Sequence, residues 1–260
     1  MPTHPHRRDR QKLILVLGLA VAAMAMVWLM PPIPQDPAYH RFADQRALLG
    51  IPHFWNTLSN LAFLIIGGLG IRQVMAGALA GGLPQLRAGY LIFFLGVALI
   101  AGGSGYYHLH PTNARLVWDR LPMAIALMAF LAVVIGERIA VPFGRRWLWP
   151  LLAAGIGAVV YWGVTEARGS GDLRPYAVVQ FLPMLLIPVI LALFPSRFSR
   201  EGYLWAALLA YAAAKAVELQ DETVFRLLGG LSGHTLKHLL AAGGAGLFLL
   251  ALRRRSRIVQ

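Results

Sequence analysis

The sequence predicts an all-α integral membrane protein, with a core bundle of seven transmembrane helices preceded by one extra N-terminal transmembrane helix. Hydrophobic residues make up 58% of the 260 residues, and the mean hydropathy is +0.61. Charged residues make up only 13%, whereas soluble domains carry roughly 25%. Long apolar runs recur along the whole chain, and a helix needs roughly 20 such residues to span a bilayer.

Eight apolar runs supply the expected helices. They lie near residues 13–30, 55–71, 88–108, 120–136, 147–165, 175–195, 202–219 and 232–252. The first run is long for a cleaved signal peptide, and "VWLMPPIPQ" that closes it lacks a clear small-x-small cleavage site. We favour an uncleaved anchor over a signal peptide for this run.

Three runs reach membrane thickness only if they include ionisable residues. The run near 120–136 must begin near Asp119, and the run near 202–219 must include Lys215 and Glu218. The last run must include His234, Lys237 and His238. Ionisable residues within a membrane span mark functional sites by default, although interfacial snorkelling is the alternative explanation for Lys215 and Lys237.

Basic residues predict the orientation of the chain. The net charge is +13, but Lys and Arg occur in short clusters between apolar runs, and no basic face interleaved with aromatic residues indicates nucleic-acid binding. With the N-terminus inside, fifteen Lys and Arg fall on inside segments and seven on outside segments. The positive-inside rule therefore places both termini in the cytoplasm. We expect a bacterial inner (cell) membrane.

This orientation brings ionisable groups from three distant segments to one depth, just below the outer surface. His108 ends one run, Asp119 begins the next, and His234 and His238 begin the last. The last two are spaced i, i+4 and share one face of a helix. The chain has no cysteine and so no thiolate ligand. Three histidines with an open fourth position are typical of catalytic zinc.

Two further side chains complete the expected chemistry. Ser104 lies one turn before His108 and can stabilise an oxyanion, and Asp119 can take a proton from water. The motif is not the protease sequence His-Glu-x-x-His, because Thr-Leu-Lys separates the two last histidines. His110 competes with His108 as a ligand, but only His108 is in register with Ser104. His53 is a weaker ligand candidate.

The pattern Ser104-x₃-His108, Asp119, His234-x₃-His238 resembles the alkaline ceramidase family, within the group of seven-helix membrane hydrolases that includes the progestin and adiponectin receptors. "FWNTLSN" (54–60) and "DRLPM" (119–123) are similar to ceramidase motifs, and "GDLRPYAVVQFLPMLLIP" (171–188) resembles bacterial members. The resemblance implies a zinc-dependent hydrolase that cleaves the amide of ceramide or a ceramide-like lipid to a fatty acid and a free amine or sphingoid base. It assigns zinc to the three histidines, the water proton to Asp119, and the oxyanion to Ser104.

The sequence also departs from the family. His53 stands where eukaryotic members have a calcium-site glutamate, so no calcium site is assigned. Arg120 replaces the second acid of the family motif. The expected domains are a basic tail, anchor and outer loop (1–49), a seven-helix hydrolase domain (50–252) and a basic cytoplasmic tail (253–260). His4 and His6 in the first tail are assigned no function.

Five residues are weaker candidates for substrate binding: Tyr107, Trp55, Lys215, Glu218 and Arg174. Lys215 and Glu218 either form an ion pair within their helix or line a substrate cavity. Arg174 either meets a lipid headgroup or anchors its helix at the interface. The alternative function is a non-enzymatic seven-helix receptor with structural zinc, which would need the ligands but no base beside them.

Overall fold

The computed structural model describes residues 7–77 and 81–258, so His4 and His6 lie outside it. It confirms the all-α class, and no strand occurs in the described ranges. The helices are α1 (Arg7–Leu29), η1 (Pro37–His40), α2 (Phe54–Leu58), α3 (Leu61–Met75), η2 (Pro84–Leu86), α4 (Arg87–Leu109), α5 (Asn113–Arg138), α6 (Val141–Ala167), α7 (Arg174–Leu193), α8 (Gly202–Leu219), α9 (Asp221–Leu228) and α10 (Gly233–Arg254).

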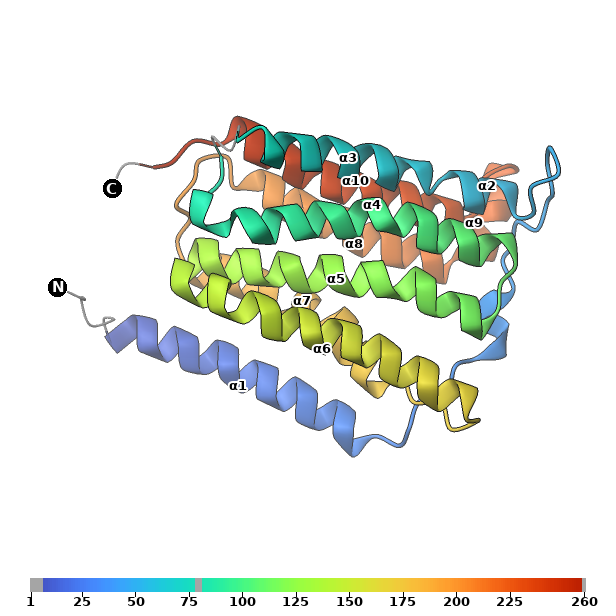
Figure 1. Cartoon of the computed structure of the whole chain (residues 1–260), viewed down its shortest axis with the longest axis horizontal. Coiled ribbons are helices and arrows are strands. Elements are labelled where there is room, and N and C mark those ends of the chain that lie inside the picture. Colours follow the sequence, from blue (N-terminus) through green and yellow to red (C-terminus); the bar gives the residue numbers. More distant parts are fainter. Residues whose placement is uncertain (1–6, 78–80, 259–260) are drawn as a thin grey trace.

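The long helices run alongside one another as a single bundle (Figure 1). Both termini lie at one end, and the short helices α2 and α9 lie at the other. Helix α5 is the centre of the bundle: it packs against α4, α6 and α7, and it is the most buried of the candidate spans. On the other side of α4, helices α3, α10 and α8 complete the bundle.

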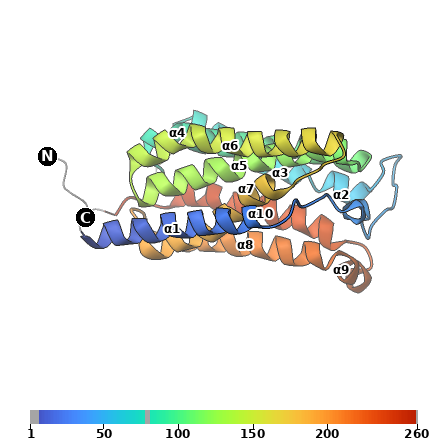
Figure 2. The same cartoon turned by 90° about the horizontal axis from the view of Figure 1, so that it is seen from below.

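Seven helical segments are long and apolar enough to cross a membrane within the described residues. These are the segments of α1, α2 with α3, η2 with α4, α5, α6, α7 and α10. The eighth expected span, α8, lies along the same bundle (Figure 2) but is not among the seven. It has only 18 residues, and Lys215 and Glu218 lower its hydropathy.

Helix α1 lies on the outside of the bundle. It packs against α7, and only 6% of its most apolar window is buried. Large apolar side chains such as Leu15, Leu17 and Met26 therefore remain exposed. Lipid is the solvent that such a surface requires, and this agrees with a multi-pass membrane protein.

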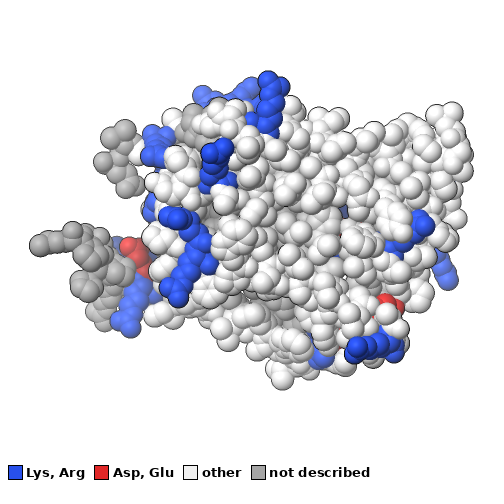
Figure 3. All heavy atoms as spheres, viewed as in Figure 1, with Lys and Arg blue, Asp and Glu red and all other residues white. Residues whose placement is uncertain are grey.

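Basic side chains gather at the end of the bundle that carries both termini (Figure 3). The exposed arginines of this end come from the ends of α3, α4, α6 and α10 and from the link after α7: Arg72, Arg87, Arg145, Arg146, Arg197, Arg200, Arg253 and Arg254. The other end holds fewer exposed basic residues in this view. The two ends of the bundle therefore differ in charge.

A short link between α4 and α5 positions the residues of interest. His110 leaves helical geometry at φ −158°, and Thr112 caps α5 by accepting a hydrogen bond from the Arg115 amide. The two helices then pack closely, because a Cβ on Gly103 would collide with the Trp118 carbonyl oxygen. Glycine at position 103 thus brings the end of α4 against the start of α5.

Candidate metal centre and active site

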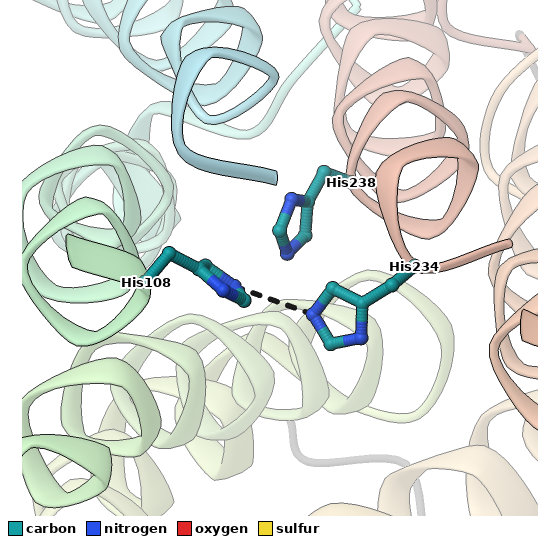
Figure 4. Close-up of side chains that lie close together, drawn as sticks. All are labelled: His108, His234 and His238. Carbon is teal, nitrogen blue, oxygen red and sulfur yellow. Dashed lines mark hydrogen bonds between the residues drawn. The ribbon is translucent and has the colours of Figure 1, made fainter. Parts of the chain in front are cut away.

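Three histidine side chains meet inside the bundle (Figure 4). They come from the ends of α4 and α10 that lie away from the termini (Figure 1). His108 comes from the last turn of α4, and His234 and His238 come from the first turns of α10. All three are buried, and one nitrogen of each lies within 4.8 Å of the others. Their ring centroids are 4.9 to 5.0 Å apart.

The donor set suits a small divalent cation. The Nε2 atoms of His108 and His234 are 3.3 Å apart. Two imidazole ligands at about 2.0–2.1 Å from a tetrahedral zinc are separated by roughly 3.3–3.4 Å. Three neutral nitrogen donors and no carboxylate within the group leave a further position for water or substrate. The cluster can therefore hold a metal ion, as its spacing in the sequence predicts.

The Ser59 hydroxyl orients the His238 ring. Its Nδ1 lies 2.8 Å from the Ser59 hydroxyl, which donates its own hydrogen to the Asn56 carbonyl oxygen at 3.2 Å. A serine has one hydrogen to donate. With that hydrogen on the carbonyl oxygen, we assign the proton of the other bond to Nδ1 of His238. The Nε2 lone pair is then free on the side that faces the other two rings, as metal binding requires.

His234 is held from two directions. Its amide donates to the Asp221 carboxylate at 2.7 Å, which fixes the first turn of α10. Its Nε2 lies 2.9 Å from Lys237 Nζ, and the same ammonium contacts Glu218 at 3.0 Å. If His234 Nε2 held a metal ion, Lys237 would keep Glu218 as its partner.

The loop between α1 and α2 (residues 30–53) covers the cluster. Phe42 is 3% exposed, and its ring lies 4.8 Å from His108 and 4.5 Å from His234. The amide of the next residue, Ala43, donates to Asp221 at 2.8 Å. The loop therefore shields two of the three rings from water on that side.

Asp119 and Ser104 lie beside the cluster and line one cavity with His238. Asp119 is 6% exposed and Ser104 is 1% exposed. The Ser104 hydroxyl interacts with the Asp119 carboxylate, but it makes no hydrogen bond of acceptable geometry among the described residues. A buried hydroxyl without a well-formed hydrogen bond is costly, and the oxygen of a bound substrate could accept one from it.

The cavity has a polar end and a long apolar part, and its volume is about 340 Å³. The polar end holds Asp119, Ser104 and His238. The apolar wall comes from positions deeper in the same helices and in α7 and α8, with side chains such as Phe93, Val97, Phe130, Ile187, Leu208 and Phe248. Such a cavity fits an amphipathic molecule with its polar group at the histidines.

The structure places two of the five weaker candidates in the cavity wall. Lys215 and Glu218 both line the cavity, and they also form an ion pair with each other. The two roles expected as alternatives therefore coexist.

The other three candidates lie outside the cavity lining. The Tyr107 hydroxyl pairs with His40 Nδ1 at 2.8 Å, because the 30–53 loop packs over it. The Trp55 ring packs on Phe54. Arg174 pairs with Asp172, where its hydrogen bond holds the pKa of the Asp172 carboxyl below its usual value.

The competing histidines have other partners. His53 Nδ1 donates a hydrogen bond to the His108 carbonyl oxygen, 2.9 Å away, so it supports the backbone of a cluster residue. His110 follows the end of α4 and is exposed. Neither belongs to the cluster that the structure describes.

The acids before α2 have local partners. Asp36 accepts a hydrogen bond from the Ala38 amide at the start of η1. Burial alone raises the pKa of the Asp44 carboxyl, but hydrogen bonds from Arg46 outweigh burial and hold the pKa below its usual value. Both carboxylates therefore stabilise the local structure of the 30–53 loop.

Several residues of the site have no signal in a single sequence. Phe42 and Tyr39 reach it from an irregular loop, whose path no periodicity predicts. Ser59 belongs to a polar face on the α2–α3 segment, for which interhelical hydrogen bonding is the ordinary expectation. Its contact with His238 could be found only by placing α3 against α10.

One comparison with known families gives a match. The sequence model of the family described as Ceramidase matches residues 49–192, which is more than half of the chain. The match includes Ser104, His108 and Asp119 and ends before α10, so the structure supplies the other two histidines independently. No curated protein matches the chain. The chain therefore belongs to the Ceramidase family, as an amide-bond hydrolase whose substrate is a lipid amide.

Proposed function

We propose that this chain is a zinc-dependent hydrolase that cleaves the amide bond of ceramide or a ceramide-like N-acyl lipid. The products are a fatty acid and a free amine or sphingoid base. The observation that carries the proposal is a group of three buried histidines, one of which, His238, lines a cavity together with Asp119 and Ser104. Ligands alone would suit a structural metal, whereas a carboxylate and a hydroxyl beside them suit hydrolysis.

His108, His234 and His238 would hold the zinc ion. When bound, such an ion lowers the pKa of its water to about 7 and so supplies a nucleophile at neutral pH. Asp119 would accept a proton from the attacking water as general base and return it to the leaving amine nitrogen. Its position at the start of α5, close against α4 at Gly103, holds the carboxylate beside the cluster.

Ser104 acts on the carbonyl oxygen of the substrate. Its hydroxyl donates a hydrogen bond as negative charge develops on that oxygen, which is the general role of an oxyanion donor. The apolar part of the cavity takes the acyl chain and keeps water away from it. The Phe42 ring over His108 and His234 limits water at the other side of the cluster.

The distribution of charge indicates how the protein is oriented in the membrane. The basic end of the bundle, with both termini, supports a cytoplasmic location for that end, in the inner membrane of a bacterium. The histidines then lie near the outer face. Residues 50–252 form the hydrolase domain, and the segment before residue 50 is an addition whose Phe42 covers the site.

Purified protein and an Asp119→Asn variant test the proposal. We expect about one zinc per chain in both by elemental analysis, and hydrolysis of lipid amides by the wild type alone, with a loss of about 10²–10⁴-fold in the variant. Mass spectrometry of released fatty acid measures the reaction. A wild-type protein that holds zinc but cleaves neither ceramides nor N-acyl amino-acid lipids would be a structural zinc protein, and the proposal would be wrong.

A further inference from the structure

Arg120 is a buried arginine in the wall of the cavity. It is 5% exposed, and it lies in the second turn of α5, next to the candidate base. Nη2 donates to the Gln35 side-chain oxygen at 2.6 Å. The guanidinium lies over the rings of Trp162 and Tyr176 at 4.2 and 4.8 Å. Its side chain is thus held on several sides by uncharged groups.

The charge of this arginine is not balanced by a direct ion pair. No carboxylate of the described residues lies within 4.0 Å of the Arg120 guanidinium, and its Nη1 is buried without a hydrogen-bond partner among them. A buried charge without an opposite charge is strongly unfavourable. Aromatic faces and one neutral amide offset only part of that cost.

The rest of the cavity carries less negative than positive charge. Its wall has three basic residues, Arg120, Lys215 and Lys237, and two acidic residues, Asp119 and Glu218. Glu218 is held between the two lysines, and Asp119 interacts with Arg120 electrostatically but without a direct ion pair. A divalent cation on the histidines makes the cavity more positive still.

We propose, on the basis of the hydrolase function above, that Arg120 binds an anionic group on the amine part of the lipid substrate. The preferred substrate class is an N-acyl amide lipid with a carboxylate, sulfonate or phosphate on that part, as in an N-acyl amino acid. Arginine is suited to this role because its planar fork donates two parallel hydrogen bonds to such an oxyanion.

Position favours the amine part over the acyl part. Arg120 is bonded to Gln35 of the 30–53 loop and lies near Tyr39 of the same loop, at the end of the cavity away from its apolar wall. Along α5, the lining residues that follow it are apolar, from Met123 to Phe130. The acyl chain therefore extends along the apolar wall, and the amine part stays at the loop end with Arg120.

A matched pair of lipids tests the inference with the zinc-loaded full chain in detergent micelles. N-palmitoylglycine and N-palmitoylglycinamide differ only by a carboxylate in place of a carboxamide. We expect the wild type to show a kcat/KM about tenfold or more higher for the carboxylate. In Arg120→Gln this ratio falls to near one, and in Arg120→Lys it lies between. Arg115→Gln, an arginine of the same helix outside the cavity, keeps the wild-type ratio.

Binding supplies a readout independent of turnover. Ketomethylene analogues of the two lipids, with –CO–CH₂– in place of the amide, cannot be hydrolysed. We expect the anionic analogue to raise the melting temperature of the wild type more than the neutral one, and this difference to vanish in Arg120→Gln. If neither lipid is cleaved, the hydrolase proposal fails, and this measurement still decides the role of Arg120.

Two results would overturn the inference. One is a wild-type protein that cleaves and binds the neutral lipid as well as the anionic one. The other is an Arg120→Gln variant that keeps the wild-type preference but loses inhibition by free palmitate, because Arg120 would then hold the carboxylate of the product.

Discussion

Replacing Ser59 by alanine tests whether the Ser59 hydroxyl orients His238 for metal binding. The hydroxyl lies 2.8 Å from Nδ1 of this ring and donates to the Asn56 carbonyl oxygen, so it fixes the proton on Nδ1. In Ser59→Ala, the tautomer with the proton on Nε2 becomes accessible, and that tautomer cannot bind a metal. Nδ1 also loses its buried partner.

The expected loss is about 10–100-fold in zinc affinity, the range for second-shell substitutions. This corresponds to about 1.4–2.8 kcal/mol, which agrees with about 1–3 kcal/mol for a buried polar group left without its partner. Competition with a chromogenic chelator measures the zinc dissociation constant of the purified protein in detergent.

Thr57→Ala is the matched control, since it removes a hydroxyl from the same short helix. That hydroxyl donates to the Pro52 carbonyl oxygen and does not touch the cluster. We expect its zinc affinity to equal that of the wild type. Thermal unfolding of the metal-free proteins separates weak binding from misfolding. A zinc dissociation constant in Ser59→Ala within twofold of the wild type would refute the assigned tautomer.

Three other predictions concern separate parts of the chain. His108→Ala loses bound zinc by elemental analysis while His110→Ala keeps it. The reverse result would show that His110, and not His108, is the metal ligand. Gly103→Ala lowers the free energy of unfolding by about 1–3 kcal/mol, because its Cβ meets a backbone oxygen of α5. Gly102→Ala leaves the free energy of unfolding unchanged, since a Cβ there has nothing within 4 Å in the described structure. Equal melting temperatures of the two variants would contradict this prediction. The pKa of Asp172 is lowered in the folded protein, so its ion pair stabilises the fold at pH values above the usual pKa of about 3.9. This stabilisation is lost as the pH falls through the folded pKa. Asp172→Asn should therefore lower the melting temperature more at pH 7 than at pH 3, and equal decreases at the two pH values would contradict this prediction.

Hydropathy and spacing predicted the class of fold and the histidine cluster. The apolar runs correspond to the helices, and the i, i+4 spacing of His234 and His238 put both rings on one face of α10. Counting spans from an inside N-terminus placed His108 at the same depth. The hydropathy pattern, the i, i+4 spacing and the count of membrane spans were therefore enough to predict that the three histidines lie together.

Contacts made by irregular segments could not be predicted in this way. Phe42 reaches the histidines from a loop, and a loop has no repeating pattern that assigns its side chains to a face. The aromatic surroundings of Arg120 come from α6 and α7, so they depend on how three helices pack. The reduced hydropathy of α8 was visible in Lys215 and Glu218, but the second ion pair of Glu218, with Lys237, was not.

The division of the metal cluster between α4 and α10 has a consequence for how the protein is made. A membrane protein is synthesised and inserted from its N-terminus, and two of the three ligands lie in the last helix. A chain still on the ribosome has His108 buried in an unfinished bundle, with no second imidazole to share an ion. Capture of the metal therefore waits until α10 has joined the bundle. Since α10 also packs between α3 and α8, the same helix completes both the packing on this side of the bundle and the set of ligands.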